Sequence, residues 1–442
     1  MLNFIWLGLI LLAVLLGGWN DRLPQVTEGA FDAAKAAVLE IALPLVGITA
    51  LWLGMMRLAE KAGMIRSLAR ILRRPLRRLF PDVPADHPAM GSMLMNMAAN
   101  MIGLTNAATP LGLRAMQDLE RLNPHPGTAT NAMCTFLAIN TSSLQLLPMT
   151  AISILAAKGS ANPSAIVSTA LLATTCSTIA GITAVKLLER MRAFRVGSIR
   201  LPLPSDPSDP SDPSDPSDHP TEAPTVPASL PLWGRVLLVT FLATFGLLLW
   251  RLLSHPVAGG PSATGFVRFM NAFSILAIPF FLAGLPLYAA LRRVPVYEEF
   301  VEGAREGFEV AVRIIPFLVA MLVAIKMFRE AGGVELITRH IGPALAWIGF
   351  PPDLLPMALT RPLSGSASIG LFTDLVDTLG PDHLVTRMAA TLMGSTETTL
   401  YVAAVYFGAV GVRRVRHAVA AGLLADLAGV IASVAICRLM WG

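Results

Sequence analysis

Two polar runs interrupt apolar stretches of the sequence, and their side chains are suited to binding a small polar solute. The first run contributes Asn140, Thr141, Ser142 and Gln145, and the second contributes Ser395, Thr396, Glu397, Thr398 and Tyr401. Hydroxyl and amide groups can hydrogen-bond a neutral solute or coordinate a cation. Each run is expected to lie inside a helix of otherwise apolar residues, and the two runs are expected to face one another.

Glu397 is the residue in these runs with the most specific chemistry. A carboxylate at membrane depth either pairs with a cation or takes up a proton, and both behaviours can couple ion movement to solute movement. The alternative is a fixed ion pair, for which Arg361 is the obvious partner. Asp374 is a second candidate for ion coupling, with simple solvation as its alternative, and Asp426 is a lone acid in the last apolar segment.

Two longer segments, 88–120 and 354–380, combine apolar residues with polar side chains and with helix-breaking glycine or proline. Their candidate binding residues are Asn96, Asn100 and Asn106 in the first segment and Arg361, Ser364, Ser366 and Ser368 in the second. Breaking a helix in lipid strands backbone groups, so a break must face protein or water. The alternative is close helix packing through small residues such as Ala98 and Gly365.

Membrane helices are the elements that must position these residues. The chain is 54% hydrophobic and only 14% charged, which excludes a soluble fold. Runs long enough to span a hydrocarbon core lie at 2–18, 37–56, 165–188, 236–253 and 418–440. The net charge of +5 comes from arginines clustered at segment ends, which indicates membrane orientation and not nucleic-acid binding. No metal ion or cofactor is expected, because the cysteines and histidines show no ligand spacing.

The sequence repeats itself on either side of a low-complexity segment. Glu60 aligns with Glu330 and Pro88 with Pro356, and the glycines that follow the two glutamates predict helix C-terminal caps. The expected organisation is a first membrane repeat at 1–200, a disordered Ser-Asp-Pro-rich linker at 201–231, an extra membrane helix at 232–253 and a second membrane repeat at 267–442.

Basic clusters predict how the two repeats are oriented. The basic clusters all lie on the cytoplasmic side if segments 88–120 and 354–380 dip into the membrane and return. These clusters are at 57–78 and near 190–200, 292–293 and 413–416. The sparsely basic loops 20–36, 158–162 and 254–266 then lie outside, whereas fully spanning segments would put two basic clusters outside. The predicted fold is an all-α polytopic membrane protein of two inverted-topology repeats, each with about four membrane helices and a broken or re-entrant segment.

At these motifs the sequence resembles two known families. Residues 1–200, with motifs at 86–91, 106–112 and 136–141, resemble spore maturation protein A, and residues 267–442, with motifs at 361–365, 394–399 and 406–411, resemble spore maturation protein B. The resemblance implies a fusion of the two proteins in the nucleoside recognition or Gate group. That group is similar to parts of concentrative nucleoside transporters and of a ferrous-iron transporter.

The function expected from these features is a transporter or gated pathway for a small polar, nucleoside-like solute, with Na⁺ or H⁺ coupling. The alternatives are an intramembrane enzyme and a membrane scaffold acting in cell-envelope or spore maturation. The expected partners are the solute, the lipid bilayer and the coupling ion, with no nucleic acid, and a homo-oligomer is left open. We expect a bacterial inner membrane location, with the N-terminus and linker cytoplasmic and the C-terminus outside.

Overall fold

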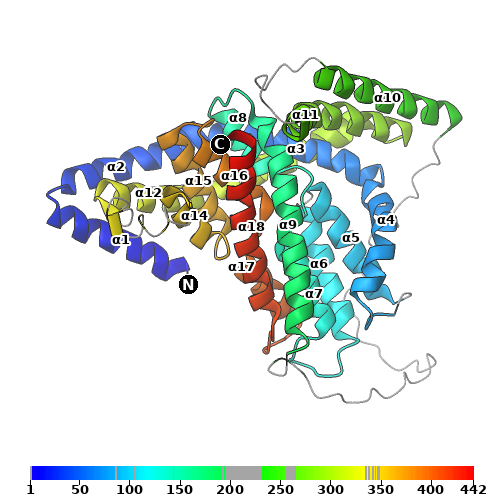
Figure 1. The fold of residues 1–442 in the computed structure, drawn as a ribbon, viewed down its shortest axis with the longest axis horizontal. Helices are drawn as coiled ribbons and strands as arrows, with labels where there is room; N and C mark the ends of the chain where they lie inside the picture. Colours follow the sequence, from blue (N-terminus) through cyan, green and yellow to red (C-terminus); the bar gives the residue numbers. More distant parts are fainter. Residues whose placement is uncertain are drawn as a thin grey trace.

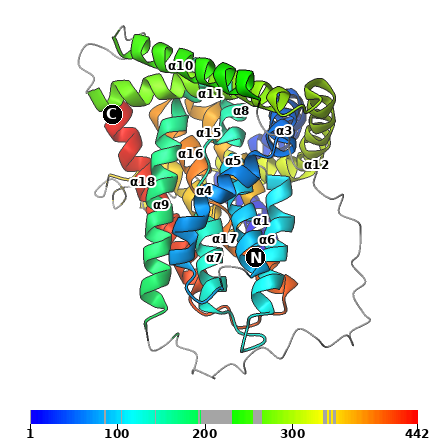
Figure 2. The same ribbon diagram turned by 90° about the vertical axis from the view of Figure 1, so that its right-hand side faces the viewer.

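The computed structural model is helical throughout the part of the chain that it describes, with one isolated bridge between Thr128 and Arg414. The described residues are 2–84, 87–103, 105–142, 144–191, 194, 231–254, 265–333, 336, 339, 340, 343, 345 and 349–442. The predicted linker at 201–231 lies outside them, apart from Pro231. Figures 1 and 2 show the arrangement from two directions.

In the described part of the first half there are nine α-helices and two short irregular helices. They are α1 Leu2–Trp19, α2 Leu23–Ala36, the π-helix η1 Ala37–Ala42, α3 Leu43–Lys61, α4 Met64–Leu79, α5 Pro88–Ile102, α6 Thr105–Glu120, α7 Asn131–Ser142, α8 Met149–Ala157, the 3₁₀ helix η2 Pro163–Ala165 and α9 Ile166–Leu188.

The helices described after the linker begin with a long apolar pair. They are α10 Leu232–Ser254, α11 Gly265–Leu291, α12 Val296–Glu330, the 3₁₀ helix η4 Pro352–Leu354, α14 Leu355–Thr360, α15 Gly365–Leu379, α16 Leu384–Ser395, α17 Thr399–Ala409 and α18 Ala418–Trp441. Four stretches of the described chain are long and apolar enough to cross a membrane: residues 163–188, α10, α11 and α18. The predicted class, an all-α polytopic membrane protein, is confirmed, whereas the inverted orientation of the repeats stays a prediction.

One predicted loop is wrong. Residues 20–36 were expected to form a loop, but α2 occupies most of this range and packs against α12. A proline in the first turn suits the helix start, and Val26, Gly29 and Ala33 form a buried stripe. Tertiary burial of that stripe therefore decides the local structure.

The two halves are joined by close helix packing through glycine. Helices α3 and α12 approach so closely that a side chain on Gly307 would lie 2.5 Å from the Cα of Ala50. Helices α9 and α18 run side by side (Figure 1), with Gly181 against Ala425. Small residues allow such close backbone approach between membrane helices. Each pair takes one helix from each half, so the halves form one packed body.

The predicted glycine caps are confirmed. Helix α3 ends at Lys61, and Gly63 then adopts a left-handed conformation with φ of 76°. Helix α12 ends at Glu330, and Gly332 follows with φ of 89°. A residue without a side chain takes this conformation at little cost, so the two helices stop within one residue of equivalent points.

Candidate functional site

Helices α5 and α6 form a hairpin that is broken at Gly103. The two helices pack against each other, and Gly103, with φ of 92°, gives its N–H to the carbonyls of Ala99 and Asn100. The left-handed conformation favours glycine at this position. The hairpin returns toward the side from which it started, and its turn lies deep among the other helices (Figures 1 and 2).

The corresponding segment of the second half is broken at a different point. Between α14 and α15 the chain leaves the helix at residues 361–364, where Pro362 has no N–H to give. Ser364 then caps α15 by accepting a hydrogen bond of 3.2 Å from the N–H of Ala367. At the offset that pairs Pro88 with Pro356, Gly103 pairs with Leu371, which lies inside α15. The two breaks are therefore not equivalent in sequence.

The two polar runs are themselves helix breaks, which corrects the prediction that each lies inside a helix. Helix α7 ends at Ser142 and α8 begins only at Met149, while α16 and α17 are separated by an extended stretch at 396–398. Hydroxyl groups explain the interruption, because Thr141 donates to the carbonyl of Ala138 and Ser395 to that of Leu392. Such local hydrogen bonds compete with the helical pattern.

Three backbone hydrogen bonds connect the four breaks. The N–H of Leu146 donates to the carbonyl of Met101 at 3.0 Å, which ties the α7–α8 break to the first hairpin. The N–H of Glu397 donates to the carbonyl of Thr141 at 2.8 Å, which joins the two polar runs. The N–H of Leu400 donates to the carbonyl of Pro362 at 3.0 Å, which ties the α16–α17 break to the α14–α15 break. Backbone groups freed by the breaks thus find partners at one place, which we call the crossing.

A charged group lies at the crossing. Arg361, only 5% exposed, donates to the carbonyl of Met393 at 3.0 Å and to the carbonyl of Thr396. Its Nη2 lies 3.8 Å from Oε2 of Glu397, while Gln145 donates to Oε1 of Glu397 at 2.9 Å. The ion pair with Arg361, which was the alternative reading of Glu397, therefore exists, but the shortest bonds of Arg361 go to backbone carbonyls.

Glu397 is the accessible member of this group. Its side chain is 32% exposed, although its neighbours Thr396 and Thr398 are buried. A side chain on Gly365, the first residue of α15, would lie 3.2 Å from the hydroxyl of Thr398, which precedes α17. The N-termini of α15 and α17 thus lie close together, and Glu397 comes two residues before α17, where helix dipoles favour negative charge. The crossing can hold an ionised Glu397 and still offer its oxygens to hydrogen-bond donors.

Three predicted asparagines form a buried network next to the crossing. Asn100 donates to Oδ1 of Asn140 at 2.8 Å, and Asn140 donates to the carbonyl of Phe136 at 2.9 Å. Asn96, which is 0% exposed, donates to the carbonyl of Ala108 at 2.7 Å. These amides bind each other and the backbone, so the structure gives them a role in fixing the hairpin against α7.

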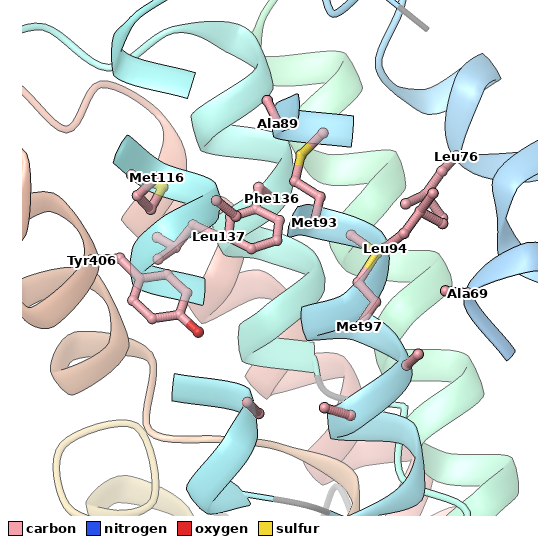
Figure 3. Packing of buried hydrophobic residues seen from close by; sticks show 14 of the residues in the cluster. Ala69, Leu76, Ala89, Met93, Leu94, Met97, Met116, Phe136, Leu137 and Tyr406 are labelled. Atoms are coloured by element: carbon pink, nitrogen blue, oxygen red, sulfur yellow. The ribbon is translucent and has the colours of Figure 1, made fainter. Parts of the chain in front are cut away.

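Tyr406 on α17 completes this network, and the sequence reasoning missed it. Its ring stacks on Phe136 with centroids 5.8 Å apart, and its hydroxyl lies 3.3 Å from Nδ2 of Asn96 and 3.4 Å from Oδ1 of Asn140. Figure 3 shows Tyr406 and Phe136 among the buried hydrophobic residues. A tyrosine in an apolar helix carries a polar group that needs a partner when buried. The need of a buried tyrosine hydroxyl for a hydrogen-bond partner is the sequence signal that could have identified Tyr406.

Gly112 on α6 makes room for Tyr406, which gives a prediction. A methyl group at Gly112 would lie 2.1 Å from the Tyr406 hydroxyl, so Gly112→Ala is expected to destabilise the protein by about 1–3 kcal/mol. Thermal unfolding of the purified protein measures this, and Tyr406→Phe in the same background should recover part of the loss. Gly91→Ala is the control, because nothing lies near that position. Equal melting temperatures for the two alanine variants would contradict the packing described.

The hydroxyl residues named from the sequence bond to the backbone or to one another. Ser142 donates to the carbonyl of Ile139, Ser368 donates to the carbonyl of Ser364, Ser364 and Ser366 lie 3.3 Å apart, and Ser395 lies 3.2 Å from Ser433. Thr396 donates to the carbonyl of Leu392. These contacts stabilise the breaks.

Two predicted site residues, Asp374 and Tyr401, are not brought to the crossing. Asp374 forms an ion pair of 2.5 Å with Arg329 at the end of α12. Tyr401 is 62% exposed on the outside of α17. The side chain of Asn106 lies outside the described residues, so its place in the site stays a prediction.

Helix α18 covers the crossing with glycines. Gly422 lies against Thr141 and Thr399, and Gly429 lies against Thr396. Asp426, between them in sequence, accepts a hydrogen bond of 2.7 Å from Thr399. The seven-residue spacing of these glycines places them on one face of the helix and was the available sequence signal.

These features define a polytopic helical membrane protein in which four helix breaks meet at one crossing. The nucleoside recognition (Gate) family matches residues 42–158 and 311–413, which include all four breaks. The chain is 48% identical to spore maturation protein B of Bacillus subtilis over 176 residues, covering 40% of this chain and 99% of that protein. It is 42% identical to spore maturation protein A of the same organism over 182 residues, covering 41% of this chain and 92% of that protein.

The chain therefore belongs to the spore maturation protein family and carries nucleoside recognition regions. It is also similar to the crystal structure of the YdaH transporter of Alcanivorax borkumensis, with 16% sequence identity and a TM-score of 0.35, covering 99% of this chain and 97% of that chain.

Proposed function

We propose that the protein is a transporter or gated pathway for a small polar, nucleoside-like solute, and that the solute binds at the crossing. The observation that carries the proposal is the hydrogen bond from Glu397 to the carbonyl of Thr141, which joins the unwound parts of two broken helices. Interrupted membrane helices use freed backbone groups and helix ends to bind solutes in many transporters. A rigid scaffold would not need such costly breaks at one place.

The chemistry of the crossing suits a solute that donates hydrogen bonds. Glu397 presents a partly exposed carboxylate, and Gln145 beside it offers an amide that can donate and accept. The hydroxyls and exocyclic amines of a nucleoside are donors of this kind. The nucleoside recognition family match agrees with this choice of solute.

Flux in proteoliposomes tests the proposal. The full chain would be reconstituted and supplied with nucleosides, nucleobases, amino acids and small sugars, with Na⁺, H⁺ or no gradient. We expect uptake or efflux of at least one nucleoside above that of empty liposomes. If no solute of the panel moves under any gradient, the transport proposal fails.

The same preparation separates transport from the other two functions. An intramembrane enzyme would turn over a lipid or cell-wall precursor, and that turnover would disappear in Glu397→Gln while solute movement persisted. A membrane scaffold would lose assembly, and not solute binding, when the polar runs are changed. The proposal predicts lost solute binding in a correctly inserted protein.

We further propose the inner membrane as the location, with the N-terminus and linker in the cytoplasm and the C-terminus outside. The basic helix α4, with arginines at its C-terminal end, supports a cytoplasmic position for that part of the first half. Two close-packed helices, α5 and α6, agree with a segment that dips into the membrane and returns.

Cysteine labelling tests this orientation. In a background with Cys134→Ala, Cys176→Ala and Cys437→Ala, we expect an impermeant maleimide to label Gly442→Cys in intact spheroplasts. Ser208→Cys in the linker should react only after lysis. Labelling of the linker cysteine from outside would contradict a cytoplasmic linker, and labelling of both cysteines from the same side would contradict the inverted arrangement of the repeats.

A further inference from the structure

Asp426 is a buried carboxyl group that the proposed solute site does not use. It lies within α18, one of the helices long and apolar enough to cross a membrane, and it is only 3% exposed. Thr399, the first residue of α17, donates to its Oδ2 at 2.7 Å. Within the described part of the chain its Oδ1 is buried without a hydrogen-bond partner.

The surroundings of Asp426 supply no dedicated positive partner in the described residues. Helices α7, α9, α16 and α17 pack against α18. The helical stretches of α7 and α17 carry no charged residue. Lys186 of α9 pairs with Glu189 at 3.2 Å, and Arg387 of α16 pairs with Asp382 at 3.4 Å.

Arg361 and Glu397 are the charged groups that act on Asp426 from the crossing. Arg361 is held by the carbonyls of Met393 and Thr396, and its one carboxylate within ion-pair distance is Glu397. In the described residues Arg361 forms an ion pair with Glu397 and none with Asp426. Cys437 on α18 itself bonds with Thr391, and the tyrosine on the buried face of α17, Tyr406, belongs to the asparagine network.

An ionised carboxylate at this depth is unfavourable unless a cation neutralises it. We propose that Asp426 binds a monovalent cation, either H⁺ or Na⁺, and that this is the coupling site of the pathway in place of Glu397 or Asp374. This inference rests on the proposed function for its role in coupling, although cation binding itself needs no transport. Oxygen ligands are available for Na⁺, since the hydroxyls of Thr141 and Thr399 both lie over Gly422, one turn from Asp426.

The position of Asp426 explains how the cation and the solute are linked. Thr399 begins the helix that follows the extended stretch carrying Glu397, and it bonds directly to Asp426. Occupation of Asp426 changes the charge that Thr399 faces and so favours one arrangement of the stretch at 396–398. A cation at Asp426 and a solute at Glu397 then alter each other's affinity by the same factor.

Thermal unfolding of the full chain in nanodiscs tests the cation site without any solute. One series replaces choline chloride by NaCl at fixed pH and ionic strength, and a second varies the pH in choline chloride. We expect the melting temperature to rise by about 2 °C or more with Na⁺, or to fall as the pH rises in the absence of Na⁺, because a bound cation stabilises the folded state. The first response identifies Na⁺ and the second identifies H⁺.

Asp426→Asn removes the charge with little change in shape. It is expected to abolish the dependence of the melting temperature on Na⁺ or on pH, whichever the wild type shows. Asp32→Asn, at an exposed acid on α2, is the control and should keep it. If Asp426→Asn does not fold, Thr399→Val takes its place, because it keeps the carboxyl group and removes the hydrogen bond to it. The cation concentration at the midpoint of the change in melting temperature should then shift by about tenfold. The inference is overturned if the wild type responds to neither cation or if the Asp426 and Thr399 variants respond as the wild type does.

Failure of transport and failure of this inference are distinguishable. A protein that moves no solute but loses its cation dependence in Asp426→Asn contradicts the proposed function alone. A protein whose transport and cation dependence are unchanged in Asp426→Asn contradicts the cation site alone.

Discussion

Glu397→Gln is expected to weaken solute binding by about 10- to 100-fold, because a hydrogen bond to a charged group is worth roughly 1.5–3 kcal/mol. The substitution keeps the size of the side chain and its contact with Gln145, which now meets an amide in place of a carboxylate. It also removes the negative charge that Arg361 and the two helix N-termini favour. Equilibrium binding of the solute that moves best in the flux panel measures the effect.

Glu302→Gln is the matched control for this prediction. Glu302 is an exposed acid on α12 that pairs with Arg305 three residues later, and exposed pairs of this kind contribute little. Its variant should bind the solute as the wild type does. Unchanged binding in Glu397→Gln, in a protein that remains monodisperse, would remove Glu397 from the solute site.

Arg361→Met has the second large expected effect, and that effect is on stability. Removing the guanidinium leaves the buried carbonyls of Met393 and Thr396 without their donor and leaves Glu397 without its cation. Breaking a buried charged contact in this way costs about 3–5 kcal/mol. We expect a strongly lowered melting temperature and loss of monodisperse protein, with Arg361→Lys in between because a lysine cannot reproduce the forked geometry.

Two further variants separate the causes of this loss. Arg305→Met removes an exposed arginine and should leave the melting temperature nearly unchanged. The double variant Arg361→Met with Glu397→Gln should recover part of the stability, since no unpaired carboxylate then remains. A melting temperature for Arg361→Met equal to that of the wild type would show that the crossing does not depend on this arginine.

The membrane helices and the presence of breaks could be predicted because both follow from local sequence. Long apolar runs set the limits of α1, α9, α10 and α18, and glycine and proline mark the breaks at 88–120 and 354–380. The contact of Arg361 with Glu397 was open to the sequence only as an alternative to ion coupling, because two opposite charges in apolar segments can pair with each other.

The nature of the polar runs could not be predicted because hydroxyl residues are compatible with both a helix and a break. Thr141 and Ser395 bond to their own helix three residues back, and the next residues are then held by partners far away in sequence. The N–H of Leu146 bonds to the carbonyl of Met101, and the N–H of Glu397 bonds to the carbonyl of Thr141. Such partners are known only from the tertiary structure.

The role of Asp374 depends on the same kind of distant contact. Its position in a polar segment of the second half suggested a coupling acid, but the end of α12 places Arg329 against it. Asp426 was noticed as a lone acid, and its link to the crossing through Thr399 appears only when α17 and α18 are packed together. The helices could be predicted from the sequence, but the side-chain partners between helices could not.

A structure of the full chain in lipid nanodiscs, with the best-moving solute at a saturating concentration, tests the central claim most directly. We predict density for the solute between the α7–α8 and α16–α17 breaks, in contact with Gln145 and Glu397. Breaks that pack against each other with no solute between them, while the solute binds elsewhere, would contradict the account.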